Sequence, residues 1–252
     1  MSLFPSIIAL AFVCEFVDSA LGMGYGTTLT PLLMMLGYEP LQIVPAILLS
    51  EFATGFIAAF SHHRLGNVDL RPGTHAFKVA GVLAACSTLG VVSAVVLALN
   101  VPKTAVKLYV GVLVLLMGIT ILVTMSRRKS PGFSWRKVIG LGLVAAFNKG
   151  ISGGGYGPVV TGGQMLSGVD PKNAIAICSL AEGVTSAVGV VAYLAAGREI
   201  GWILAPSLAL GAVLSAPLAA FAVSKVSTGR MTAVVGGFTT ALGIWTLLGL
   251  LG

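Results

Sequence analysis

Gly22-Met-Gly-Tyr-Gly26 returns in this chain as Gly153-Gly-Gly-Tyr-Gly157, 131 residues later. The similarity extends outward from the glycines, because many identical residues recur at the same spacing between the segments 16–54 and 147–185. Three glycines within five residues break a helix, since each one costs about 1 kcal/mol relative to alanine. The sequence therefore predicts two related halves, each with an interrupted helix, an arrangement in which a substrate lies between the two breaks.

The composition is that of a membrane protein. Hydrophobic residues make up 56% of the chain, charged residues 9%, and the mean hydropathy is +0.99, whereas a soluble domain carries roughly 25% charged residues. The net charge is +7, but the basic residues lie in loops, which indicates orientation in a membrane rather than nucleic-acid binding. Cys14, Cys86 and Cys178 lie apart within apolar runs, so no metal site, cofactor or disulfide is expected. Residues 1–3 lack the basic region of a signal peptide, so the first apolar stretch is expected to remain as membrane structure.

Six continuous apolar runs have the roughly 20 residues that a membrane-spanning helix needs. They cover residues 42–61, 76–99, 103–125, 173–196, 202–223 and 230–251. We predict an all-α polytopic membrane protein with two inverted repeats, each made of a glycine-broken helix pair and three transmembrane helices. The first repeat covers residues 1–126 and the second 134–252, and a basic cytoplasmic linker joins them at 127–133.

The glycine clusters lie in two further apolar segments, 3–37 and 135–168. Each segment could form two stacked crossings or a re-entrant hairpin, and residues 3–21 alone are nearly long enough to span. With hairpins, 11 basic residues share one face against 3, whereas full crossings reduce the split to 9 against 5. The positive-inside rule therefore favours hairpins. Three crossings per repeat would then invert the halves relative to each other and place both termini outside the cytoplasm.

The glycine turns predict an anion site. A helix break in the membrane frees backbone N–H groups, and the helices expected from Thr27 and Pro158 would point their positive ends at the turns. Small residues could instead serve tight helix packing, but two copies in register, each with a tyrosine, favour binding. The candidate substrate-binding residues are Ser19, Gly22, Met23, Gly24, Tyr25, Gly26, Thr27, Asn148, Lys149, Ser152, Gly153, Gly154, Gly155, Tyr156 and Gly157.

Charged residues within the apolar segments predict coupling or gating. Asp18 and Lys149 occupy equivalent positions in the two repeats, so they could pair with each other, or Lys149 could bind the anion, and Glu15 is a further partner. Glu51 and Glu182 are also equivalent and lie in the middle of their runs, where an isolated carboxylate costs about 3 kcal/mol or more. We expect Glu51, Glu182 and Asp18 to serve proton coupling or gating, with a structural role as acceptors of free N–H groups as the alternative.

Basic and titratable residues follow the first uninterrupted run as His62, His63 and Arg64. Residues of this kind at a membrane boundary usually anchor a helix end in the headgroup layer. Three such groups together could also attract an anion to an entrance.

Three other functions fit parts of the sequence. Gly150-Ile-Ser-Gly153 matches the motif of an intramembrane serine protease, but its nucleophile needs a histidine base within hydrogen-bond reach, and the first repeat has Leu21 in place of Ser152. A structural membrane protein would not require paired intramembrane glutamates. A passive anion channel would differ from a carrier in that its flux would neither saturate nor show counterflow.

The chain resembles the TauE/SafE family of anion permeases in three stretches. These are Phe16-Val-Asp-Ser-Ala-Leu-Gly-Met-Gly-Tyr-Gly-Thr-Thr-Leu-Thr-Pro31, His63-Arg-Leu-Gly-Asn-Val-Asp69 and Ser152-Gly-Gly-Gly-Tyr-Gly-Pro158. The resemblance covers essentially the whole chain and implies an inner-membrane transporter of small sulfur-containing anions, such as sulfite, sulfonates or sulfoacetate, often in the export direction. It places the paired glycine motifs of the family on residues 22–26 and 153–157. Met23 stands where the second copy has Gly154, which implies unequal contributions from the two hairpins.

Together these features predict a carrier that works by alternating access. Its expected partners are a small anionic substrate, the lipid bilayer and protons bound by Glu51 and Glu182. The sequence carries no signal for the oligomeric state.

Overall fold

The protein is helical throughout the residues that the computed structural model describes, which are 4–97, 103–125, 132–152 and 154–249. No strand occurs among them, which confirms the predicted all-α class. The ten helices within these ranges are α1 (Pro5–Leu21), α2 (Tyr25–Met35), α3 (Pro40–Arg64), α4 (His75–Leu97), α5 (Lys103–Met125), α6 (Trp135–Ser152), α7 (Tyr156–Leu166), α8 (Pro171–Ala195), α9 (Ala205–Lys225) and α10 (Thr228–Leu248). Most of the predicted linker at 127–133 lies outside the described residues.

The same local signals end and begin helices in both halves of the chain. Gly37 and Gly168 follow α2 and α7 with φ angles of +92° and +84°, which glycine adopts more easily than other residues. Pro40 and Pro171 then open α3 and α8, where a missing N–H is harmless. As a result, α2 and α7 have 11 residues each, and α3 and α8 have 25 each.

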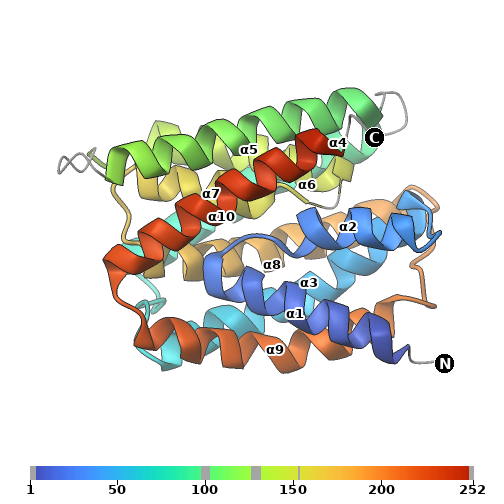
Figure 1. Ribbon diagram of the computed structural model, residues 1–252, viewed down its shortest axis with the longest axis horizontal. Coiled ribbons are helices and arrows are strands. Elements are labelled where there is room, and N and C mark those ends of the chain that lie inside the picture. The colour runs from blue at the N-terminus through green and yellow to red at the C-terminus, as the bar shows by residue number, and fades with distance from the viewer. Residues whose placement is uncertain (1–3, 98–102, 126–131, 153, 250–252) are drawn as a thin grey trace.

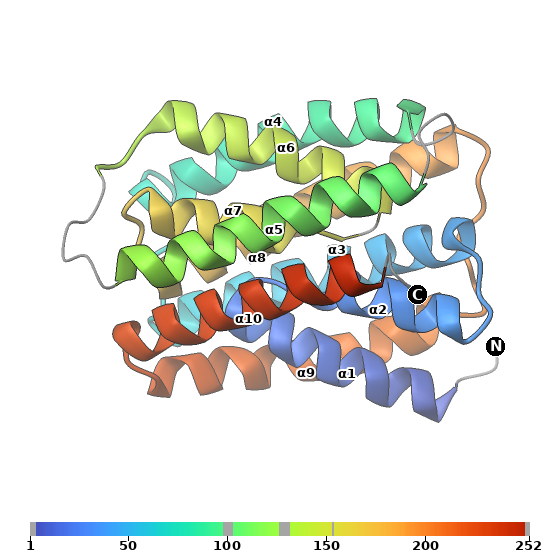
Figure 2. The ribbon, with the colours of Figure 1, turned by 45° about the horizontal axis from the view of Figure 1, so that its top comes forward.

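Each glycine cluster separates two antiparallel helices. In Figure 1, α1 starts near the N-terminus at the right and runs leftward, and α2 returns to the right. Helix α6 starts at the left of the molecule and α7 returns to the left, as Figure 2 also shows. The two pairs are therefore helical hairpins whose open ends face opposite ends of the molecule.

The chain is a multi-pass membrane protein. Among the described residues, five helical segments are long and apolar enough to cross a membrane: Gln42–Arg64, His75–Ala94, Pro171–Ala195, Ala205–Lys225 and Gly229–Leu248. They match five of the six predicted runs, and the sixth forms α5, whose apolar part in the described residues is Val114–Val123. Large apolar side chains such as Leu89 and Leu214 are exposed, as expected where lipid is the surrounding solvent.

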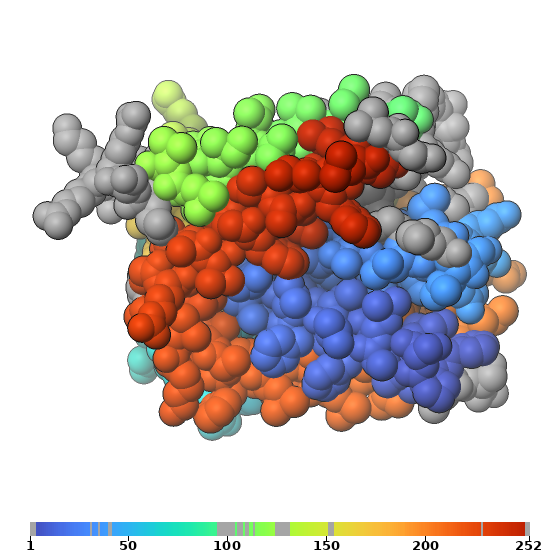
Figure 3. Space-filling view, in the orientation of Figure 1, coloured from blue at the N-terminus to red at the C-terminus, as the bar shows by residue number. Residues whose placement is uncertain are grey.

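The long helices α3 and α8 cross in the interior. A Cβ atom added to Gly55 of α3 would lie 2.6 Å from the Cα atom of Gly183 on α8, so glycine permits this close crossing. Around it, α9 packs on α1 and α3, α4 packs on α6 and α8, and α10 packs on α5. Figure 3 shows one face of the molecule, on which the side chains of α10 lie between those of α5 and those of α1 and α9.

Most basic residues lie at one end of the bundle. Helices α3 and α9 end there, and α4, α6, α8 and α10 begin there, at the left of Figure 1. We call it the basic end; among the described residues it carries Arg64, Arg71, Lys78, Arg136, Lys137, Lys172, Lys225 and Arg230. The opposite end carries Lys103, Lys107 and Arg198.

Candidate functional site

Both helix breaks have backbone geometry that glycine favours. After the end of α1, Gly22 has a φ angle of +71° and Gly24 one of +128°. Gly155, just before α7, has a φ angle of +76°. Other residues rarely adopt such angles, so the glycines explain why each hairpin turns where it does.

The two short helices begin two residues earlier than predicted, at Tyr25 and Tyr156 instead of Thr27 and Pro158. In the first hairpin the reason is a cap, because the backbone N–H of Tyr25 donates to the carboxylate of Asp18 at 2.9 Å. A carboxylate at a helix N-terminus stabilises the helix by hydrogen bonding and by its interaction with the helix dipole. The side chain of Asp18 therefore accepts a hydrogen bond from a backbone N–H group that the sequence analysis had predicted to bind an anion.

The tips of the two hairpins contact each other. The N–H of Gly155 donates to Thr27 Oγ1 at 3.0 Å, and Thr161 Oγ1 donates to the carbonyl of Gly22 at 2.9 Å. A Cβ atom added to Gly157 would lie 2.3 Å from the same carbonyl oxygen. In this conformation the glycines therefore serve close packing of one hairpin on the other, the role that the sequence had left as an alternative.

A buried trio of charges lies next to the second tip. Lys149 Nζ on α6 is 2.5 Å from Glu51 Oε2 on α3 and 2.7 Å from Glu182 Oε1 on α8. The lysine side chain has no exposed surface, and its ammonium lies 5.8 Å from the centre of the Tyr156 ring. The sequence had offered Asp18 or an anion as the partner of Lys149, and the structure pairs it with the two glutamates instead.

Next to this trio is a small acidic cavity. Glu15 borders it and accepts hydrogen bonds from Ser19 Oγ at 2.6 Å and Thr54 Oγ1 at 3.3 Å. The cavity has a volume of about 10 Å³, roughly what one water needs, so an anion of several heavy atoms does not fit in this conformation. Its lining residues are Glu15, Asp18, Glu51, Thr54, Gly55, Ala58, Ser179 and Glu182.

The charges of this region do not balance without protons. Four carboxylates, those of Glu15, Asp18, Glu51 and Glu182, line the cavity, and Lys149 is the only buried Lys or Arg among the side chains that the structure describes. Hydroxyl and amide donors stabilise Glu15 and Asp18 but do not cancel their charge. Because an uncompensated carboxylate in a membrane interior needs a proton or a cation, the cluster has the chemistry of a proton-binding site.

A chain of hydrogen bonds lies between the cavity and the basic end. His62 lies one helical turn beyond Ala58 of the cavity wall, and its Nε2 is 2.9 Å from the carbonyl of Ser19. That carbonyl can only accept, so Nε2 donates and Nδ1 accepts from Asn67 Nδ2 at 3.0 Å. The same Asn67 amide donates to the carbonyl of Ala220 on α9 at 2.9 Å. His62 is buried, so the prediction that it anchors a helix end in the headgroup layer is wrong.

The loop after α3 holds Asn67 in this position. The Nδ1 atom of His63 is 3.2 Å from the carbonyl oxygen of Val68, and Val68 is buried. At the surface, Arg71 lies 3.0 Å from Asp69, and its hydrogen bonds hold the pKa of that exposed carboxyl below its ordinary value. The second stretch of the family resemblance, residues 63–69, therefore lies at the basic end and includes Asn67, which bonds to His62 and to α9.

Both predicted tyrosine ligands make hydrogen bonds within the protein. Tyr25 Oη is 2.9 Å from Ser50 Oγ on α3 and donates to the carbonyl of Leu208 on α9 at 3.5 Å. Tyr156 Oη is 3.1 Å from Ser87 Oγ on α4. Both rings are buried, so in this conformation the tyrosines connect the short helices to the long ones.

The structure brings only part of the predicted site together. The predicted residues whose side chains line the cavity or bond to its lining side chains are Asp18, Ser19, Glu51, Lys149 and Glu182. Met23 lies elsewhere, because its sulfur accepts a hydrogen bond from Thr239 of α10 at 2.8 Å. Asn148 is buried on α6. Gly153 and the side chain of Ser152 lie outside the described residues.

Comparison with known proteins identifies the family. The model of the family described as Sulfite exporter TauE/SafE matches residues 7–246. The chain is 28% identical over 256 residues to the Probable membrane transporter protein YtnM of Bacillus subtilis (strain 168), an alignment that covers 96% of this chain and 83% of YtnM. No solved structure gives a significant match. The resemblance in the three sequence stretches is thereby confirmed, and the chain belongs to the TauE/SafE family, whose members are membrane transporters and not enzymes.

Proposed function

We propose that the protein is a secondary transporter that exports a small anion, sulfite or an organosulfonate such as sulfoacetate, across the inner membrane. The observation that carries this proposal is the fully buried ammonium of Lys149, held between carboxylates of α3 and α8 next to the hairpin tips. It is the only buried Lys or Arg among the side chains of known placement, and it lies next to the hairpin tips. The description of the family as a sulfite exporter supports the class of anion.

In the proposed cycle, the substrate and the two glutamates compete for Lys149. When Glu51 and Glu182 are ionised they hold the ammonium, as in this structure, and the anion is excluded. When they bind protons, the ammonium is free to pair with an anion that enters between the hairpins. Proton binding and anion binding are then linked at a single lysine.

Two inverted repeats would allow this site to open to either side. The hairpins enter from opposite ends. Each long helix of the first half runs opposite to its equivalent in the second half: α3 to α8, α4 to α9 and α5 to α10 (Figures 1 and 2). Rocking of residues 1–126 against 134–252 about the crossing of α3 and α8 would expose the site alternately. The basic end faces the cytoplasm by the positive-inside rule, so the His62 and Asn67 bonds form the closed cytoplasmic gate.

The membrane potential drives export when the anion leaves with fewer protons than it has negative charges. A potential negative inside favours anion exit by roughly 2.3 kcal/mol per charge per 100 mV. A proton that leaves with the anion cancels one charge and removes that contribution. The voltage dependence of the flux therefore reports how many protons accompany each anion.

Efflux from proteoliposomes tests the proposal. Vesicles with purified protein and radiolabelled sulfite should show efflux that saturates, is inhibited by sulfoacetate and drives counterflow. Valine at Gly24 or Gly155 should abolish this flux, because a β-branched residue does not tolerate their φ angles. A linear flux without counterflow would identify a passive channel instead, and no flux of sulfite or sulfoacetate would refute the substrate class.

The Glu182→Gln variant tests the proton coupling. It removes a proton-binding carboxylate but keeps a hydrogen-bonding side chain beside Lys149. We expect efflux whose pH dependence is lost or clearly reduced. A pH profile equal to that of the wild type would assign Glu182 a structural role.

A further inference from the structure

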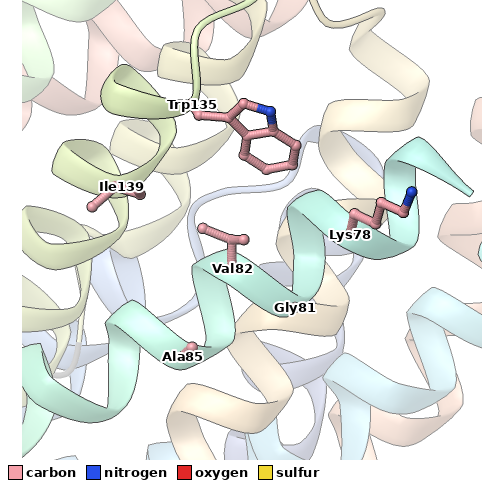
Figure 4. A pocket seen from close by; sticks show the side chains of 6 residues that line it. All are labelled: Lys78, Gly81, Val82, Ala85, Trp135 and Ile139. Carbon is pink, nitrogen blue, oxygen red and sulfur yellow. The ribbon is translucent and has the colours of Figure 1, made fainter. Parts of the chain in front are cut away.

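An apolar groove runs between α4 and α6 on the outside of the bundle, away from the acidic cavity. It is shallow and open to the outside, with a volume of about 550 Å³. Its lining residues, shown in Figure 4, are Lys78, Gly81, Val82, Ala85, Trp135 and Ile139. Trp135 and Ile139 of α6 lie on one side of the groove, and the α4 residues form the other.

The floor of the groove exists because α4 has a glycine there. Nothing lies within 4 Å of the position where a Cβ atom on Gly81 would be. Val82, Ala85 and Ile139 continue the apolar lining. An apolar trough that opens to the surroundings of a membrane-spanning bundle is suited to a hydrocarbon chain.

The groove lies at the depth of the membrane boundary. Lys78 is in the first turn of the candidate span His75–Ala94, and Trp135 is the first residue of α6. The Trp135 ring packs edge-on against Phe133 and His75, with centroid distances of 5.0 and 5.8 Å. Aromatic residues concentrate at membrane interfaces, so the headgroup of a lipid in the groove would lie level with Lys78.

The charge around the groove favours an anionic headgroup. Lys78 is exposed and forms no salt bridge with the chain's acidic residues, all of which are described. Arg136 and Lys137 follow Trp135 in the first turn of α6 and are also exposed. Basic pockets between helices on the cytoplasmic side are typical binding sites for anionic lipids.

We propose that this groove binds an anionic phospholipid, with one acyl chain along Gly81, Val82 and Ile139 and the phosphate on Lys78. The bound lipid covers the apolar floor that α4 and α6 leave open. It also neutralises the uncompensated ammonium at the boundary.

Native mass spectrometry with phosphatidylglycerol and phosphatidylcholine tests this site. The wild-type protein should retain phosphatidylglycerol in preference to phosphatidylcholine. Lys78→Gln should weaken phosphatidylglycerol retention about fivefold, the contribution of one basic residue near an anionic surface. Gly81→Leu should fill the groove and remove the tightest bound lipid of either kind.

Two variants serve as matched controls. Gly140→Leu adds the same side chain on α6 at a position that does not line the groove and has nothing within 4 Å. Arg230→Gln removes a different exposed charge at the basic end. Both should retain phosphatidylglycerol as the wild type does. Equal retention by the wild type and Gly81→Leu, no preference between the two lipids, or an equal loss in Arg230→Gln would each overturn the proposal.

Discussion

Replacing Lys149 with methionine removes the buried cation while keeping a long, flexible side chain. At 2.7 Å the attraction between Lys149 and Glu182 is about 6 kcal/mol at an effective dielectric constant of about 20, and desolvation offsets much of it. Removal of the cation leaves Glu51 and Glu182 buried without a counter-charge. Breaking a buried pair in this way costs about 3–5 kcal/mol, which lowers the ratio of folded to unfolded protein at least a hundredfold.

A neutral version of the same site separates charge from packing. In Lys149→Met with Glu51→Gln and Glu182→Gln, no unpaired charge remains in the trio, so most of the lost stability should return. This triple variant should still fail to transport sulfite, because no cation remains to bind it. Arg71→Met is the control, since it breaks an exposed pair with Asp69 that contributes little to stability.

Circular dichroism of the protein in detergent during unfolding measures the loss of stability. Efflux from proteoliposomes measures the loss of transport. We expect Lys149→Met to unfold well before the wild type, the triple variant to unfold near it, and Arg71→Met to match it. Wild-type stability in Lys149→Met would show that the buried trio does not exist as described. Saturable sulfite efflux by the triple variant would show that Lys149 is not the cation that binds the substrate.

Three further changes test the hairpin contact, the gate and the helix cap. Gly157→Ala should destabilise the protein by about 1–3 kcal/mol and impair transport, because the new methyl group meets backbone of the other hairpin; Gly237→Ala, with nothing within 4 Å, should not, and equal melting of the two would contradict the contact. With native cysteines replaced by serine and a cysteine at Ala58, Asn67→Ala should speed labelling by a membrane-impermeant thiol reagent from the basic end; an unchanged rate would remove Asn67 from the gate. Asp18→Ala should lower stability by about 0.5–2 kcal/mol through loss of the cap, whereas Asp18→Asn keeps an acceptor and most of that stability; thermal melts that coincide for both would rule out the cap.

Local features of the fold could be predicted because they depend on a few neighbouring residues. The breaks at Gly22–Gly26 and after Ser152 follow from the backbone freedom of glycine, and the starts of α3 and α8 follow from Pro40 and Pro171. The start of α2 was misplaced because its cap, Asp18, lies on the far side of the turn. A sequence pattern for the turn alone does not show that the chain folds back far enough for this contact.

The partners of Lys149 could not be predicted in the same way. Its carboxylates are 98 and 33 residues away in the chain, and the equivalence of the repeats pointed to Asp18. A signal was nevertheless present, since two equivalent glutamates in the middle of apolar runs and a lysine with no equivalent lysine all needed partners. Asn67 was not predicted as part of the proposed gate because its amide bonds to Ala220 on α9, 153 residues away.

The amino-acid sequence by itself determined that the protein lies in a membrane, that it is helical, where its helices break and to which family it belongs. Composition and short-range backbone preference decide these features, and both are properties of the chain. The tertiary structure alone decided which carboxylates hold Lys149, how the hairpin tips contact each other, and that His62 and Asn67 are hydrogen-bonded between Ser19 and Ala220. The physical reason is that a buried charge must find compensation wherever packing brings an opposite charge within contact distance, and this packing depends on how α3, α6 and α8 cross.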